Sequence, residues 1–198
     1  AMEAEIQTRV SFLTASVNTG AISGLNPKLA GYKIIAAAIK DQDDASHRAK
    51  LANMITTANG GDGEMFALPC IARYLLQFGS RMTPTEAASI KSALQAQTHE
   101  LFGHGTLNHA AMQCLSYYLL AQYYPDVIWT DKSAGTWTSA QVMATNKANW
   151  LRRWVRFSQN GSHAEITGST YSIVNLMCVL NIVDFCQDAE LKAVAEKE

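Results

Sequence analysis

The stretch LFGHGTLNHAAMQCLSYYLLAQYYPD, residues 101–126, carries the pattern that decides the fold class. After Thr106, which is placed to cap a helix, apolar residues recur at steps of three and four, the spacing of a helix with one buried face. The pattern stops before Pro125, which cannot continue a helix. The buried face is expected to contain Leu107, Ala111, Cys114, Leu115, Tyr118 and Leu119.

The same spacing extends over nearly the whole chain. Helices are predicted over residues 3–17, 27–40, from Asp43 or Asp44 to the NGGDG turn at 59–63, and over 64–78, 84–101, 139–158, 170–185 and from Ala189 on. The TPTE sequence at 83–86 has the pattern of a capping box with proline in the first turn. No convincing alternating strand is found, and 126–137 is expected to be a loop. The prediction is one all-α domain over 1–198, with antiparallel helical hairpins that form an incomplete α/α toroid or barrel.

The composition excludes two classes of partner. The net charge of the 198 residues is −1, and no basic domain or stripe predicts nucleic-acid binding. No apolar run approaches the roughly 20 residues of a membrane span. Charged residues make up 17%, below the usual share of about 25%, and Asn, Thr, Ser and Gln supply much of the polar surface. We therefore expect a secreted or periplasmic protein that handles carbohydrate, with any signal peptide lying before residue 1.

The four cysteines do not have the spacing of a metal or redox site. Cys70, Cys114, Cys178 and Cys186 include no CxxC pair, and each lies among apolar residues in a helical segment. They are predicted to be buried apolar side chains, with one disulfide as the alternative. No metal ion and no cofactor is predicted.

The turn before the helix at 107 brings His104, Asn108 and His109 together. A helix start has unpaired N–H groups and a partial positive charge, which favours an anion and disfavours a protonated imidazole. An asparagine amide there is suited to hold a carboxylate, and a neutral histidine is suited to accept a proton. Gly103 and Gly105 allow a close approach of the backbone. The alternative is that Asn108 and His109 only cap their own helix.

A second polar cluster follows the long helix. Residues 157–195 contain His163, Glu165 and Tyr171, and the tyrosine enters a helix directly after a Gly-Ser-Thr sequence. A phenol at this position is suited to give a proton to a leaving oxygen. The alternative is that Tyr171 is a core tyrosine and that Glu165 is an ordinary loop carboxylate.

Aromatic and cationic residues are interspersed in KANWLRRWVRF, residues 147–157. Aromatic faces stack on sugars and cations pair with sugar acids, so Trp150, Arg153 and Arg156 are candidate substrate-binding residues together with His104, His163 and Glu165. The helical spacing favours a core position for Trp150, and the arginines fit a solvated face.

GTLNHAAM at 105–112 and NGSHAEITGSTYSIVNLMCVLNIVDFCQDAELKAVA at 160–195 resemble the α/α-toroid polysaccharide lyases, of alginate lyase or heparinase-like type. The resemblance covers about residues 60–195. It implies β-elimination on a uronic-acid polysaccharide or oligosaccharide. Asn108 looks like the residue that neutralises the carboxylate, His109 like the base or its assistant, Tyr171 like the proton donor, and Glu165 like the structural carboxylate.

The sequence departs from that family in two respects. Leu107 stands where those lyases often have a polar side chain, and the chain has fewer predicted helices than a complete toroid. It also ends inside a helical pattern, from which we expect a fragment of a longer protein. Two other functions therefore stay open. One is a glycoside hydrolase, which needs two facing carboxylates from Asp62, Glu64, Glu100 or Glu165; the other is a helical carbohydrate-binding or scaffold domain without catalysis.

Overall fold

The computed structural model of the chain describes residues 22, 25, 27–58, 62–103, 106–133, 135–160 and 169–197. Side chains at 27–28, 57–58, 62–64, 154–160 and 169–173 are outside this description. The helix predicted over 3–17 therefore lies outside the described residues.

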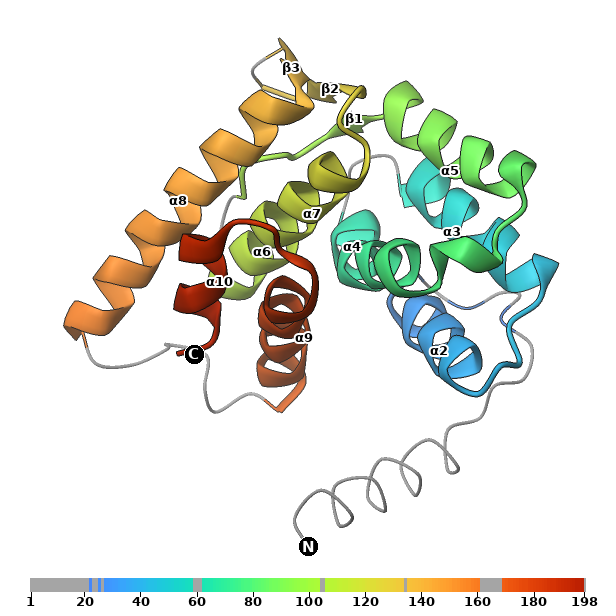
Figure 1. The fold of residues 1–198 in the computed structure, drawn as a ribbon, viewed down its shortest axis with the longest axis horizontal. Coiled ribbons are helices and arrows are strands. Elements are labelled where there is room, and N and C mark those ends of the chain that lie inside the picture. Colours follow the sequence, from blue (N-terminus) through green and yellow to red (C-terminus); the bar gives the residue numbers. More distant parts are fainter. Residues whose placement is uncertain are drawn as a thin grey trace, which may run out of the picture.

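The described chain is mainly helical, as predicted (Figure 1). Most predicted helices are confirmed within a few residues at each end. The predicted helix that begins after Thr106 contains a π-helical segment, η3, between two α-helical parts. The helical elements are α2 (Pro27–Ile39), α3 (Ala45–Ala58), α4 (Asp62–Arg73), η1 (Tyr74–Phe78), η2 (Gly79–Arg81), α5 (Pro84–Ala96), α6 (Leu107–Ala110), η3 (Ala111–Leu115), α7 (Ser116–Tyr123), α8 (Ser139–Asn160), α9 (Ser169–Phe185) and α10 (Ala189–Ala195).

A small sheet corrects the all-α prediction. Strands β1 (Thr98–His99), β2 (Ile128–Asp131) and β3 (Gly135–Thr138) pair in that order, with β1 and β2 parallel and β2 and β3 antiparallel. The loop predicted over 126–137 and the helix predicted to reach residue 101 are therefore wrong. Strands this short show no alternation that a sequence pattern could detect, and they exist because they pair with one another.

The capping box at the start of α5 is confirmed. The Thr83 hydroxyl accepts from the Glu86 N–H at 3.3 Å, and the Glu86 carboxylate accepts from the Thr83 N–H at 2.8 Å. Pro84 occupies the first turn, where its missing N–H costs nothing.

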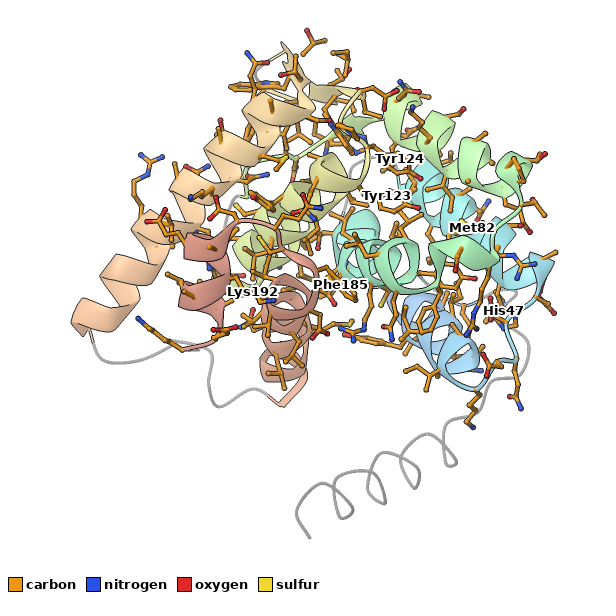
Figure 2. The ribbon with its side chains drawn as sticks, viewed as in Figure 1. His47, Met82, Tyr123, Tyr124, Phe185 and Lys192 are labelled. Carbon is orange, nitrogen blue, oxygen red and sulfur yellow. The ribbon has the colours of Figure 1, made fainter. Side chains whose placement is uncertain are left out.

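The central run of helix α6–η3–α7 is covered on several sides. α4, α8 and α9 all pack against η3, and α4 and α8 also pack against α7. Side chains fill the space between these helices, and Tyr123 and Tyr124 lie at the end of α7 (Figure 2). The largest fully buried side chains of the core include Tyr74, Leu68, Ile71, Tyr117 and Trp129.

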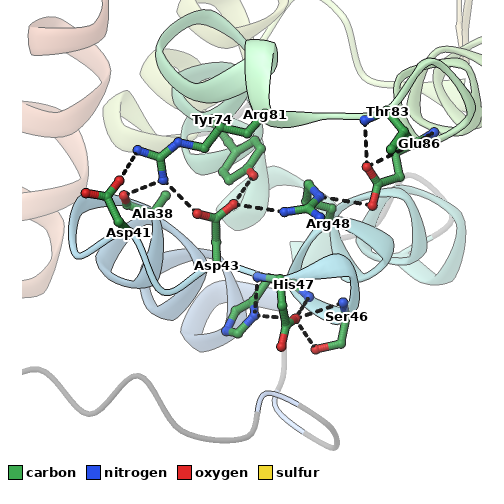
Figure 3. A network of polar contacts seen from close by, with 11 residues as sticks. Ala38, Asp41, Asp43, Ser46, His47, Arg48, Tyr74, Arg81, Thr83 and Glu86 are labelled. Carbon is green, nitrogen blue, oxygen red and sulfur yellow. Dashed lines mark hydrogen bonds and ion pairs between the residues drawn. The ribbon is translucent and has the colours of Figure 1, made fainter.

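A buried carboxylate ties the N-terminal helices together (Figure 3). The side chain of Asp43, between α2 and α3, is 3% exposed. It accepts from the Tyr74 hydroxyl at 2.5 Å, from Arg81 at 2.7 Å and from Arg48 at 3.3 Å. Arg48 also donates to Glu86 at 2.9 Å. Burial alone would raise the pKa of Asp43, but the hydrogen bonds from Tyr74 and Arg81 hold it below its usual value.

We predict that Asp43→Asn lowers the free energy of unfolding by about 3–5 kcal/mol, because it leaves two arginines facing a neutral amide. Chemical denaturation at neutral pH would measure the loss. Asp41→Asn is the matched control: Asp41 pairs with the same Arg81, but its side chain is 82% exposed. It should change stability by less than about 1 kcal/mol.

Acid provides a second readout of the same network. Because the pKa of Asp43 is lowered on folding, its contribution is present above the unfolded value of about 3.9. It is lost as the pH falls through the folded value. Stability of the unaltered chain should therefore fall more steeply below about pH 4 than stability of the Asp43→Asn variant. Equal acid sensitivity of the two proteins would contradict the assignment.

Candidate functional site

Gly103 shapes the turn that leads into α6. Its φ is +69°, a left-handed conformation, and a Cβ there would lie 2.8 Å from the Cys114 Sγ and 3.0 Å from the Ala110 Cα. Only glycine fits this position without strain. The close approach predicted for Gly103 is thus confirmed, and what approaches the backbone is the protein's own helix. Gly105 and His104 lie outside the described residues.

Asn108 is drawn into the protein interior at the start of α6. Thr106 occupies the predicted N-cap position with an extended backbone, but its hydroxyl donates to the Asn108 side-chain oxygen and does not cap the helix. Asn108 is 1% exposed and Met112 is fully buried, although neither is among the six residues expected to form the buried face. The reason is that neighbouring helices cover the run on more than one side.

His109 lies at the edge of the same helical turn and is half-buried. Its ring packs edge-on against Phe66 of α4, with ring centres 6.3 Å apart and planes at 86°. No local sequence pattern predicts this neighbour, because Phe66 belongs to a helix that is distant in the chain. The Thr106–Asn108 contact was detectable, since hydroxyl and amide side chains two residues apart often bond locally.

Arg153 of α8 reaches the turn before α6. One guanidinium nitrogen donates to the Gly103 carbonyl at 3.1 Å. Nearby, burial raises the pKa of the Cys114 thiol to about 12, while the charge of Arg153 opposes that rise. The thiol therefore stays protonated at neutral pH, and it donates to the Phe102 carbonyl at 3.3 Å. The site thus contains a cation and an imidazole at the start of α6.

α9 packs against the α6–η3–α7 run. At their far ends, Gln122 of α7 donates to the Phe185 carbonyl at 2.9 Å and accepts from the Gln187 N–H at 2.9 Å. Tyr171 and Asn108 lie equally far before this contact, about 21 Å along a helix axis. α6 also packs against α9, and in Figure 1 both α7 and α9 run upward, at an angle to each other. The backbone of Tyr171 thus belongs to the helix that packs against α6; the tyrosine side chain lies outside the described residues.

The remaining predicted residues divide into two groups. Trp150 is 2% exposed in the hydrophobic core, so its core interpretation is confirmed and its indole has no face open to a sugar. His163 and Glu165, and the side chain of Arg156, lie outside the described residues. Lys147, next to this group, pairs with Asp188 at 2.7 Å and with Glu190 at 2.8 Å, which fastens α8 to α10.

The four cysteines lie among the described residues, are buried and form no disulfide, which confirms their interpretation as apolar core residues. Among the described residues, no three His, Cys, Asp or Glu side chains gather where they could hold a metal ion. In the same part of the chain, no helix is both long and apolar enough to cross a membrane. No protein-family model, curated protein or solved structure matches the chain.

We predict that Gly103→Ala destabilises the protein by about 2–5 kcal/mol. The alanine pays for its left-handed backbone, about 1–2 kcal/mol, and for contacts with Cys114 and Ala110. Gly135→Ala is the control, because Gly135 has a φ of +81° but its added Cβ would meet nothing within 4 Å. It should show the backbone cost alone. Equal losses in thermal denaturation of the two variants would contradict the tight packing at Gly103.

Proposed function

We propose that the chain is a polysaccharide lyase-like domain that acts by β-elimination on a uronic-acid-containing polysaccharide. The observation that supports the proposal is the packing of α9, the helix that contains Tyr171, against α6, the helix that contains Asn108 and His109. Arg153 supplies a positive charge at the same end of the bundle through its contact with the Gly103 carbonyl.

Each step of the elimination has a candidate residue. Neutralising the sugar carboxylate acidifies the proton on the adjacent carbon, and we assign this to Asn108 with help from Arg153. His109 then removes that proton or assists its removal. The C–H electron pair forms a carbon–carbon double bond as the bond to the glycosidic oxygen breaks. Tyr171 gives its phenolic proton to that oxygen, and Glu165 supports this segment.

The wider architecture and location belong to the same proposal. We propose that the helical hairpins form part of an incomplete α/α toroid and that the protein is secreted or periplasmic. The antiparallel pairing of α7 and α8 supports the hairpin arrangement. Ser139 at the start of α8 donates to the Tyr124 carbonyl at 2.6 Å, while Arg153 further along α8 reaches back to Gly103 before α6.

A second candidate function is a helical carbohydrate-binding or scaffold domain without catalysis. The burial of Asn108 and Trp150, at 1% and 2% exposure, favours it, because neither side chain presents a surface to a sugar. For the hydrolase alternative, the described candidate is Glu100. Its carboxylate is engaged by Lys132 at 3.2 Å and by Gln113 at 2.9 Å. The side chains of Asp62, Glu64 and Glu165 lie outside the described residues.

We predict that ultraviolet absorbance rises when the protein is incubated with one member of a panel of alginate, pectate, hyaluronan and heparan, because elimination leaves an unsaturated sugar. Tyr171→Phe should lower the rate by about 10²- to 10⁴-fold, the usual contribution of a general acid or base. Circular dichroism should show an unchanged helical spectrum for this variant.

The control variant is Tyr123→Phe. Tyr123 lies at the opposite end of α7 and is 37% exposed, so its loss should leave the rate unchanged. Full activity of the folded Tyr171→Phe variant would overturn the role of this tyrosine. Oligosaccharide binding without any product would favour the non-catalytic domain. New reducing ends without a rise in absorbance would favour the hydrolase.

A further inference from the structure

Asn146 of α8 is a buried amide in an apolar interface. It is 1% exposed, and neither its amide nitrogen nor its amide oxygen has a hydrogen-bond partner among the described residues. Val142 and Trp150, one helical turn to either side, are core residues at 0% and 2% exposure. A buried amide that bonds to nothing is costly, so such a group in a native protein usually has a bound partner such as water.

The position of Asn146 along the bundle follows from two contacts of α8, one at its start and one further along the helix. Ser139 bonds to the Tyr124 carbonyl after α7, and Arg153 bonds to the Gly103 carbonyl before α6. α8 is therefore antiparallel to the α6–η3–α7 run. Asn146 lies about 10 Å along the axis from Ser139. This brings it level with the beginning of α7, near Ser116, which is itself 2% exposed.

The backbone at this level changes its hydrogen-bond spacing. η3 is π-helical and α7 is α-helical, and the Ser116 N–H between them bonds to the Gln113 carbonyl. A π-helix bonds each N–H to the carbonyl five residues back, and an α-helix to the carbonyl four back. Where the π spacing gives way to the α spacing, the backbone N–H groups of the helix skip a carbonyl, which is then open to another donor.

We propose that ordered water is bound between α8 and the η3–α7 junction, where it accepts a hydrogen bond from the Asn146 amide and donates one to a backbone carbonyl of the junction. The site satisfies two buried groups that face each other across an apolar interface. It also fixes α8 at one position against α7, because sliding α8 by a turn would put Asn146 opposite apolar side chains. The site is separate from the end of the bundle assigned to sugar chemistry.

We predict that Asn146→Leu lowers the Tm by about 3–6 °C, because it expels the water and leaves the junction carbonyl without a donor. Asn149→Leu is the matched control on the same helix. Asn149 is half-buried and its side-chain oxygen accepts from Arg152 at 2.7 Å. Its replacement should shift the Tm by no more than about 1 °C.

A high-resolution crystal structure of the unaltered chain tests the site directly, even where Asn146→Leu does not fold. Water density within hydrogen-bond distance of the Asn146 amide and of a carbonyl at the junction is the expected result. Absence of that density, or direct bonds from both amide atoms to protein groups, would overturn the proposal. So would a higher Tm of Asn146→Leu, which would mean that the amide is buried without any partner.

Discussion

Burial of the α6–η3–α7 run is the constraint on which the other helices depend. α4, α8 and α9 all pack against this run, so the side chains on its surface set the distance of each helix from the run. Residues from Ala110 to Ala121 are buried without exception, polar Gln113 and Ser116 among them. A helix surrounded in this way shows no polar face, and the neighbouring helices must supply partners for its polar groups.

The polar groups within the bundle are satisfied by residues far apart in sequence. Tyr117 of α7 bonds to His99 of β1 at 2.9 Å, and the other ring nitrogen of His99 contacts the Leu94 carbonyl at 2.7 Å. Because a carbonyl only accepts, that nitrogen carries a hydrogen, and in the neutral imidazole the other nitrogen accepts from the Tyr117 hydroxyl. Trp129 of β2 donates to Ser139 at 2.8 Å. These bonds hold the small sheet against the helices, although the strands themselves are short.

Local signals in the sequence predicted the elements that depend on local physics. The capping box at Thr83 and the start of α2 at Pro27 are found where the sequence predicts them. The strands β1 to β3 and the burial of Asn108 were missed because both depend on partners elsewhere in the chain. The spacing of apolar residues gives the period of a helix, but it does not say how many neighbours will cover that helix.

The start of α6 shows both local and long-range effects on two candidate site residues. Asn108 and His109 are adjacent, so their side chains point about 100° apart around the helix. One of them enters the interior, where its oxygen receives the Thr106 hydroxyl, and the other remains half-buried beside Phe66. In the described structure Asn108 therefore supports the turn, and His109 is the more exposed of the two. The proposed elimination requires that the turn, which contains Gly103 and is contacted by Arg153, present the amide as well as the imidazole.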